Sequence, residues 1–277
     1  MQTQRVATEE IKMKIRTTAW LFLSFSALSA YAAAINVNLG TADAFAVLAG
    51  STVTNTGPTV VFGNLGVSAG SAITGFPPGI INGAMHDNDA VAGLAQNDLT
   101  TAYNFAAGET VTQDLTGQDL GGLTLLPGVY FFMSSAQLTG TLTLNNLGNP
   151  NAVFVFQIGS TLTTASNSSV VFINSGGDAG DSVFWQVGSS AALGTTTSFA
   201  GNILALTSIT LNTGANITCG RALARNGAVT MDTNHVSIDR EGCETVVGSV
   251  PEPGTATLLG AGLFLGFIVC RRGLRRA

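Results

Sequence analysis

Residues 153–160 read VFVFQIGS, and residues 182–189 repeat this pattern as SVFWQVGS. Each copy is followed by a second short pattern, TLTT at 161–164 and ALGT at 192–195. The second pattern returns as TLNT at 210–213 and TMDT at 230–233. Its apolar residue lies at 162, 193, 211 and 231, so the steps are 31, 18 and 20 residues. A step of about 19 residues fits one turn of a three-sided coil of short β-strands, and such repeats indicate stacked units that share one core.

Side chains alternate between the two faces of a strand, which divides these patterns into inward and outward positions. Ile209, Leu211, Val229 and Met231 are predicted to point inward. The second Thr of each pattern reaches the outward surface only if the strand bends at a corner, and the alternation does not decide this. The candidate surface residues are Thr161, Thr163, Thr164, Ala192, Thr195, Thr210, Asn212, Thr213, Thr230 and Thr233. Gly194 and Asp232 would also be outward, and Asp232 is a charge on an otherwise uncharged surface.

One segment departs from the β pattern. From about Ala84 to Ala107, apolar residues recur every three or four positions, which predicts an amphipathic helix that Gly108 ends. Its apolar residues are Val91, Leu94, Ala95, Leu99, Ala102, Tyr103 and Ala106. This stripe must be buried, most simply along one side of the stacked coils.

The longer step of the repeat, 31 residues, contains SGGDAGD at 175–181, which we interpret as a loop inserted at a corner.

Both ends of the chain carry targeting signals. Lys12, Lys14 and Arg16 precede an apolar stretch at 19–30 and small residues at 30–34, which is typical of a secretory signal peptide over residues 1–34. Translation could begin at Met1 or at Met13. Residues 250–277 contain Pro251, Glu252 and Pro253, then an uncharged apolar run at 255–270 and four arginines. That order of parts resembles the PEP-CTERM sorting tail of Gram-negative bacteria. The resemblance implies transient anchoring in the inner membrane and processing by an exosortase-type protease, after which the protein lies at the cell surface or is secreted. A plain C-terminal membrane anchor is the alternative.

The mature region, residues 35–249, contains three arginines, no lysine and 13 acidic residues, a net charge of −10. Nucleic acid and anionic membranes require clustered cations, so both are excluded as partners. The length fits one domain.

The mature region contains two cysteines, Cys219 and Cys243. We expect them to form a disulfide because the chain is exported. Two buried free thiols are the alternative.

The mature region resembles the bacterial and fungal discontinuous β-solenoid ice-binding proteins. The resemblance covers residues 35–238 and is carried by LGTADAFAVLAG at 39–50, GGLTLLPGVY at 121–130, the repeated pair above and GRALARNGAVT at 220–230. It implies a mostly β fold, a three-faced discontinuous β-solenoid with one long α-helix packed alongside. It also implies that the first coil is not next to the second, and that one flat, Thr-rich face adsorbs to an ice surface.

The physical case for such a face is that stacked strands repeat every ~4.7–4.9 Å, a spacing comparable to repeats in the ice lattice. Threonine has a methyl group that excludes water, a hydroxyl that holds it and a stiff χ1.

The alternative function is that of a cell-surface or biofilm-matrix protein without ice activity. Such a protein would be structural or adhesive, with an exopolysaccharide matrix as its partner. The protein is not expected to be an enzyme or to need a cofactor or metal, because Asp87/Asp89 and Asp178/Asp181 lack a neighbouring cation. His86 and His235 are single histidines without metal-ligand spacing and are interpreted as structural or surface residues.

Overall fold

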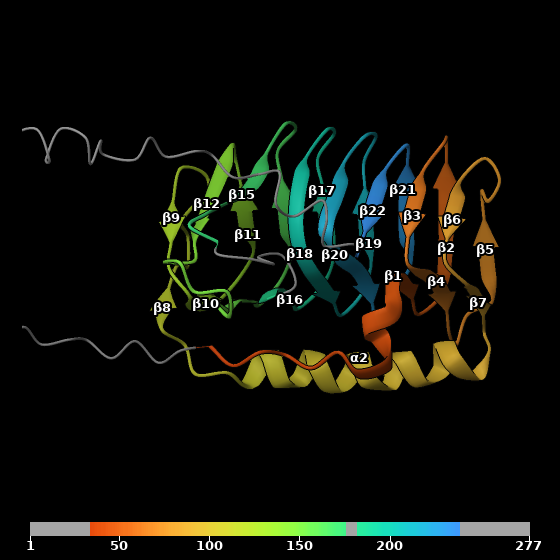
Figure 1. Ribbon diagram of the computed structural model, residues 1–277, viewed down its shortest axis with the longest axis horizontal. Coiled ribbons are helices and arrows are strands. Elements are labelled where there is room, and N and C mark those ends of the chain that lie inside the picture. The colour runs from red at the N-terminus through yellow and green to blue at the C-terminus, as the bar shows by residue number, and fades with distance from the viewer. Residues whose placement is uncertain (1–33, 176–181, 239–277) are drawn as a thin grey trace, which may run out of the picture. The chain divides into compact units, whose positions relative to one another are not determined.

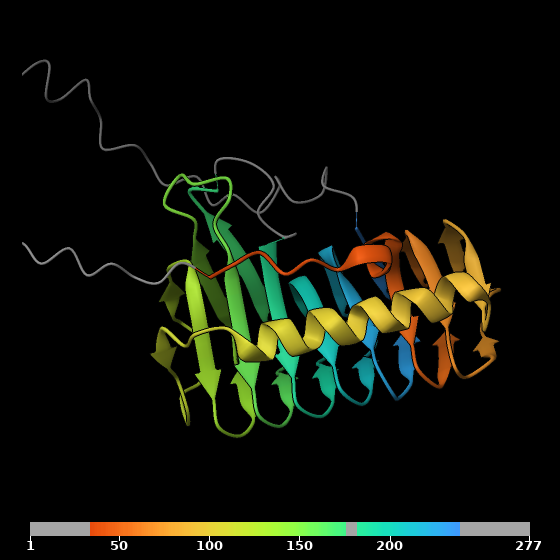
Figure 2. The same ribbon diagram turned by 90° about the horizontal axis from the view of Figure 1, so that it is seen from below.

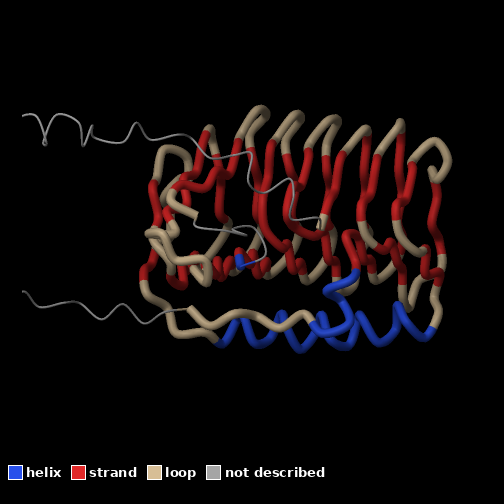
Figure 3. The backbone as a smooth tube through the Cα atoms, in the orientation of Figure 1, coloured by secondary structure: helices blue, strands red, loops and turns tan. Residues whose placement is uncertain are grey.

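Parallel strands of the coils predicted by the repeat lie side by side, with one long helix along them (Figure 1). The computed structural model describes residues 34–175 and 182–238 of the 277-residue chain, and the elements below belong to one compact unit. The strands pair in three runs, which are joined by short turns (Figure 3). Within these residues the predicted combination of mostly β structure with one long α-helix is therefore confirmed.

The first run lies beneath the helix, and we call it the helix-covered run. Its pairings are all parallel. In spatial order it consists of β8 (Gln113–Asp114), β10 (Gly128–Phe132), β13 (Phe154–Ile158), β16 (Val183–Val187), the second parts of β18 (Ser198–Ala205) and β20 (Asn216–Ala224), β1 (Phe45–Ala49), β4 (Asn64–Val67) and β7 (Met85–Asp87).

The second run is a separate parallel sheet, which we call the seven-strand sheet. Its spatial order is β11 (Ala136–Leu138), β14 (Leu162–Thr164), β17 (Ala191–Leu193), β19 (Ile209–Leu211), β21 (Val229–Asp232), β2 (Thr52–Thr56) and β5 (Ala72–Thr74).

The third run shares β18 and β20 with the helix-covered run, because these long strands bend from one run into the other. It is also parallel. Its remaining strands are β9 (Thr124–Leu125), β12 (Thr141–Asn145), β15 (Ser169–Ile173), β22 (His235–Ser237), β3 (Val60–Phe62) and β6 (Ile80–Asn82).

The repeated apolar motif forms a column of aromatic rings in the core. Phe156 and Trp185 occupy equivalent places in the two copies and pair in register. Their ring centroids are 3.9 Å apart and the planes differ by 8°. Val155 and Phe184, which immediately precede these two residues, face the other way and are buried beneath the helix. Since both faces of these strands are buried, their sequences are apolar except for one glutamine in each, rather than alternating.

The long helix, α2 (Ala90–Gly108), packs along the helix-covered run (Figure 2). Five of the seven residues of the predicted stripe are buried there, namely Ala95, Leu99, Ala102, Tyr103 and Ala106. The predicted start near Ala84 is wrong by six residues. Asp89 is the N-cap and accepts a hydrogen bond from the Ala92 N–H at 2.8 Å, so the helix begins there, and the preceding residues form β7. Val91 and Leu94, which we assigned to the stripe, are 45% and 57% exposed.

The coils follow a different order in space from the order in the sequence. The first coil (45–62) pairs on one side with the last coil (216–237) and on the other with the second coil (64–82). The expectation that the first and second coils are not neighbours is therefore wrong. The break falls after the second coil, because α2, 19 residues and about 28 Å long, carries the chain from β7 at one end to β8 at the other.

Several predictions fall outside the described residues: the signal peptide before Ala34, most of the loop at 175–181, Cys243 and the whole sorting tail, including Pro251, Glu252 and Pro253. Cys219 is disulfide-bonded. In the ranges 34–175 and 182–238, no helix is both long and apolar enough to cross a bilayer.

Candidate functional site: a threonine row on the seven-strand sheet

One residue from each strand of the seven-strand sheet lies in a single row. The strand register aligns them in the order Gln137, Thr163, Ala192, Thr210, Thr230, Thr54 and Thr74. Their neighbours within the strands, such as Leu162 and Leu211, are buried, so the row residues point outward. Neighbouring strands are ~4.8 Å apart, which sets the spacing of the row. We call this set the threonine row.

Four of the predicted surface residues lie in the threonine row: Thr163, Ala192, Thr210 and Thr230. Thr54 joins them from the N-terminal coil, and its hydroxyl donates to the Thr230 hydroxyl at 3.3 Å although the residues are 176 positions apart. The row contains no ionisable side chain.

Thr164 does not lie on this surface. It is 8% exposed, its hydroxyl is 2.8 Å from the Thr197 hydroxyl, and it accepts the Gly194 N–H at 2.8 Å. Strand β14 therefore continues in regular alternation through Thr164 instead of bending outward, and this hydroxyl joins neighbouring coils from inside.

The other predicted residues flank the row at the corners. Thr161 precedes β14 and donates to the Ser135 hydroxyl at 2.8 Å. Asn212 follows β19 and donates to the Leu193 carbonyl at 2.8 Å. Thr195, Thr213 and Thr233 are exposed in turns. They extend the polar surface beyond the row, but they are not members of it.

Two acidic residues lie beside the row: Asp119, which is bridged to Gln137 at one end, and Asp232. Threonines satisfy both carboxylate oxygens of Asp232. The Thr213 hydroxyl donates to Oδ2, and the Thr233 hydroxyl donates to Oδ1 at 3.0 Å. Thr233 adopts a left-handed backbone conformation with φ of 55°. The second Thr of these two patterns therefore binds the carboxylate that would otherwise hold loose water near the surface.

Sequence reasoning missed Gln137, Thr54 and Thr74. The strand TVTNT at 52–56 alternates in the same way as the later patterns, which is a signal that could have marked it as a surface strand. Its place beside β21 cannot be predicted from the repeat, because the repeated patterns all lie from residue 153 onward.

The two histidines of the sequence do not belong to the row. Outside the row, His86 Nδ1 pairs with Asp89 at 2.7 Å, and His235 packs against Phe62. Within the described ranges, no three His, Cys, Asp or Glu side chains come close enough to hold a metal ion. The row itself presents small hydroxyl and methyl groups to the solvent at a fixed spacing.

Comparison with known proteins agrees with this architecture. Residues 47–237 match the family described as ice-binding-like, and residues 249–276 match the PEP-CTERM protein-sorting motif. An ice-binding protein of Nostoc sp. (strain HG1) is 60% identical over 259 residues, which cover 92% of this chain and 94% of the relative.

Two solved structures have the same fold. An ice-binding protein from an Antarctic biological consortium is 50% identical, with a TM-score of 0.70, over 73% of this chain and 91% of that protein. An ice-binding protein from the Antarctic ascomycete Antarctomyces psychrotrophicus is 41% identical, with a TM-score of 0.71, over 74% of this chain and 99% of that protein. The chain belongs to the ice-binding-like family.

Proposed function

We propose that this protein is exported and binds ice through the threonine row. The single observation that carries the proposal is the in-register alignment of outward Thr residues across the seven-strand sheet. The names of the relatives support it, since the matched proteins are described as ice-binding. We further infer that the three strand runs are the faces of one discontinuous solenoid.

The physical argument rests on many weak contacts that act together. Neighbouring hydroxyls and methyl groups along the row keep a spacing of ~4.8 Å that a lattice with similar repeats can match. Threonine loses little rotamer freedom on adsorption because its χ1 is already restricted, and a rigid surface loses less entropy on binding than a mobile one. Ala192 interrupts the hydroxyls and Gln137 ends the row without one, so we expect activity to be modest.

Substitution of the row tests the proposal. Thr210→Tyr and Thr230→Tyr each place a ring above a flat surface, and each should reduce inhibition of ice recrystallisation about tenfold, corresponding to ~1.4 kcal/mol of adsorption free energy. The readout is the lowest protein concentration that arrests the growth of ice grains.

Thr124→Tyr is the matched control, because Thr124 is also exposed on a strand but belongs to the third run. It should keep wild-type activity, and all three variants should keep the wild-type Tm. Wild-type protein that leaves ice growth unchanged would refute ice binding.

We also propose the route of export: removal of residues 1–34 as a signal peptide, transient inner-membrane anchoring by the apolar run at 255–270, and processing near Pro251–Pro253 by an exosortase-type protease. The match of residues 249–276 to the sorting motif supports this. The same motif favours the second candidate, a cell-surface or exopolysaccharide-matrix protein without ice activity. Retention in the matrix without any effect on ice would favour that candidate.

A further inference from the structure

Residues 35–39 start beside the C-terminal end of α2 and run along the helix in the opposite direction (Figure 2). Val37 and Leu39 are 3% and 4% exposed in the cluster between α2 and the strands. Asn38 accepts the Gly40 N–H at 2.9 Å through its side chain. The backbone of Ile35 is therefore held in place by buried side chains two and four residues further on.

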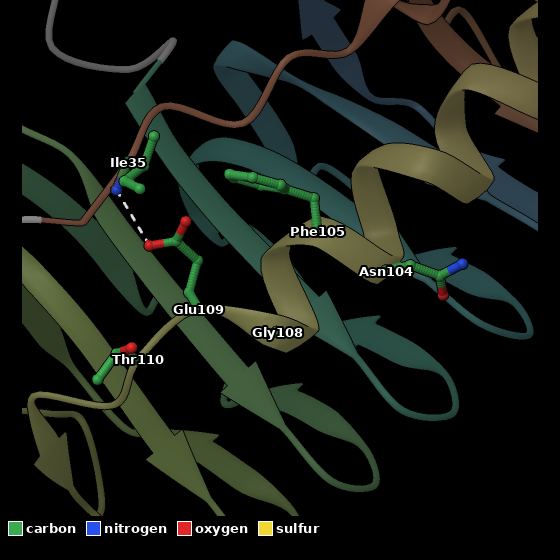
Figure 4. A pocket seen from close by; sticks show the side chains of 6 residues that line it. All are labelled: Ile35, Asn104, Phe105, Gly108, Glu109 and Thr110. Atoms are coloured by element: carbon green, nitrogen blue, oxygen red, sulfur yellow. Dashed lines mark hydrogen bonds between the residues drawn. The ribbon is translucent and has the colours of Figure 1, made fainter.

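The carboxylate of Glu109 meets this segment at its first residue. Ile35 donates its backbone N–H to Glu109 Oε2 at 3.1 Å, at the edge of an open pocket that Asn104, Phe105, Gly108 and Thr110 also line (Figure 4). Glu109 is the C-cap residue of α2. Its carbonyl accepts from the Gln157 side chain at 2.8 Å, and Gln157 is 6% exposed, so Glu109 is tied to the strands.

No basic side chain in the described ranges neutralises Glu109. These ranges contain two arginines: Arg221 pairs with Asp43 at 2.8 Å, and Arg225 lies over the Tyr103 ring at 4.6 Å. A carboxylate beside the negative end of a helix dipole is a favourable place for a cation. The backbone nitrogen of residue 35 is the group that the geometry offers.

We propose that signal peptidase cleaves the Ala34–Ile35 bond and that the new α-ammonium of Ile35 forms an ion pair with Glu109. This inference rests on the proposed export. Ala32-Ala33-Ala34 supplies the small residues that such cleavage requires. In the hydrolysis the C–N bond breaks, water gives its OH to the Ala34 carbonyl carbon and a proton to the Ile35 nitrogen, and the amine takes up one more proton from solvent.

Cleavage thereby changes a neutral hydrogen bond into a charge-assisted one. The amide has one N–H, whereas the ammonium has three and a full positive charge at neutral pH, since an α-amine has an ordinary pKa of about 7.7–8.0. Cleavage after Ala32 instead would leave Ile35 as an internal amide and Glu109 without an ion pair. The length of the mature chain therefore decides whether this contact forms.

The test uses the full 277-residue chain, expressed with its own signal in a Gram-negative host and recovered from the envelope. Intact mass should place the N-terminus at Ile35. Residues 35–277 contain no lysine, so an amine-reactive ester can label only the α-amine. Labelling of Glu109→Gln should be about two- to fivefold faster than labelling of the wild type, the range expected for a partly exposed ion pair.

Asp87→Asn, which removes the same charge at the other end of α2, should label at the wild-type rate. An exported protein that begins at Ala33 or elsewhere would overturn the proposal, and so would equal labelling of the wild type and of a Glu109→Gln variant that keeps the wild-type Tm. A chain that keeps residues 1–34 would overturn the proposed export as well. Loss of ice binding alone would not affect the ion pair.

Discussion

Two adjacent threonines in β14 illustrate how position in a strand decides the role of a residue. Thr163 is exposed in the threonine row, whereas Thr164 is buried and hydrogen-bonded to Thr197. The residue types are identical, so composition cannot separate them. Alternation along the strand does, because successive side chains point to opposite faces.

Asn234 is a buried polar residue that joins its own turn to the neighbouring turn at 212–215. It is 3% exposed, and its amide donates to the carbonyls of Asn212 at 2.9 Å and Ala215 at 2.7 Å, while its oxygen accepts the Asp232 N–H. Asn234→Ala should lower the free energy of unfolding by about 2–4 kcal/mol, because it leaves buried groups unpaired. Chemical denaturation checks this, with the exposed Asn226→Ala, expected within about 0.5 kcal/mol of wild type, as control. Similar losses in both variants would contradict it.

The hydrogen bonds of the Asp98 carboxylate make the stability of the fold depend on pH. The Thr41 hydroxyl and then the Thr41 backbone N–H, at 2.6 and 2.7 Å, lower the pKa of Asp98 below its ordinary value of 3.8. A folded-state pKa below the unfolded value stabilises the protein above about pH 3.8, and this stabilisation is lost as the pH falls through the folded value. The Tm of the wild type should therefore fall more steeply in acid than that of Asp98→Asn. Parallel Tm curves between neutral and strongly acidic pH would refute this.

At the scale of elements, α2 lies close to the strands because most of its buried residues are alanines. Ala92, Ala95, Ala102 and Ala106 are at most 1% exposed. Small side chains on the buried face leave little room between helix and strands. The helix is therefore positioned by close packing along its length and by the Asp89 cap.

This packing makes α2 sensitive to added volume. Ala102→Leu should destabilise the protein by about 1–3 kcal/mol, because the extra methyl groups force the helix away from the strands. Thr101→Leu, one residue earlier and exposed, should change stability by less than about 0.5 kcal/mol. Thermal unfolding of the two variants gives the comparison, and equal Tm values would show that the helix face is not closely packed.

The elements differ in how well their sequence predicted them. The strands around Phe156 and Trp185 were predictable, because two copies of one motif place equivalent rings in the core. The start of α2 was not, because apolar spacing alone extended the helix back to Ala84, whereas the Asp89 cap and the pairing of β7 with β4 set its actual beginning.

At the scale of the whole molecule, the threonine row is assembled from segments before and after α2. Thr54 and Thr74 precede α2, and Thr163, Thr210 and Thr230 follow it, yet all lie in one sheet. The repeat predicts coils but not which coils are neighbours. That order depends on pairing between strands such as β2 and β21, which are far apart in sequence, so this part of the row could not be predicted.

The central claim is that threonines from before and after α2 form one ice-binding surface. The partition of the protein into slowly growing ice tests this claim most directly. Wild-type protein and the third-run control Thr124→Tyr should be enriched in the ice. Thr54→Tyr, from the first coil, and Thr210→Tyr, from a late coil, should both remain mainly in the liquid. Wild-type protein left in the liquid, or Thr54→Tyr enriched as strongly as wild type, would contradict the account.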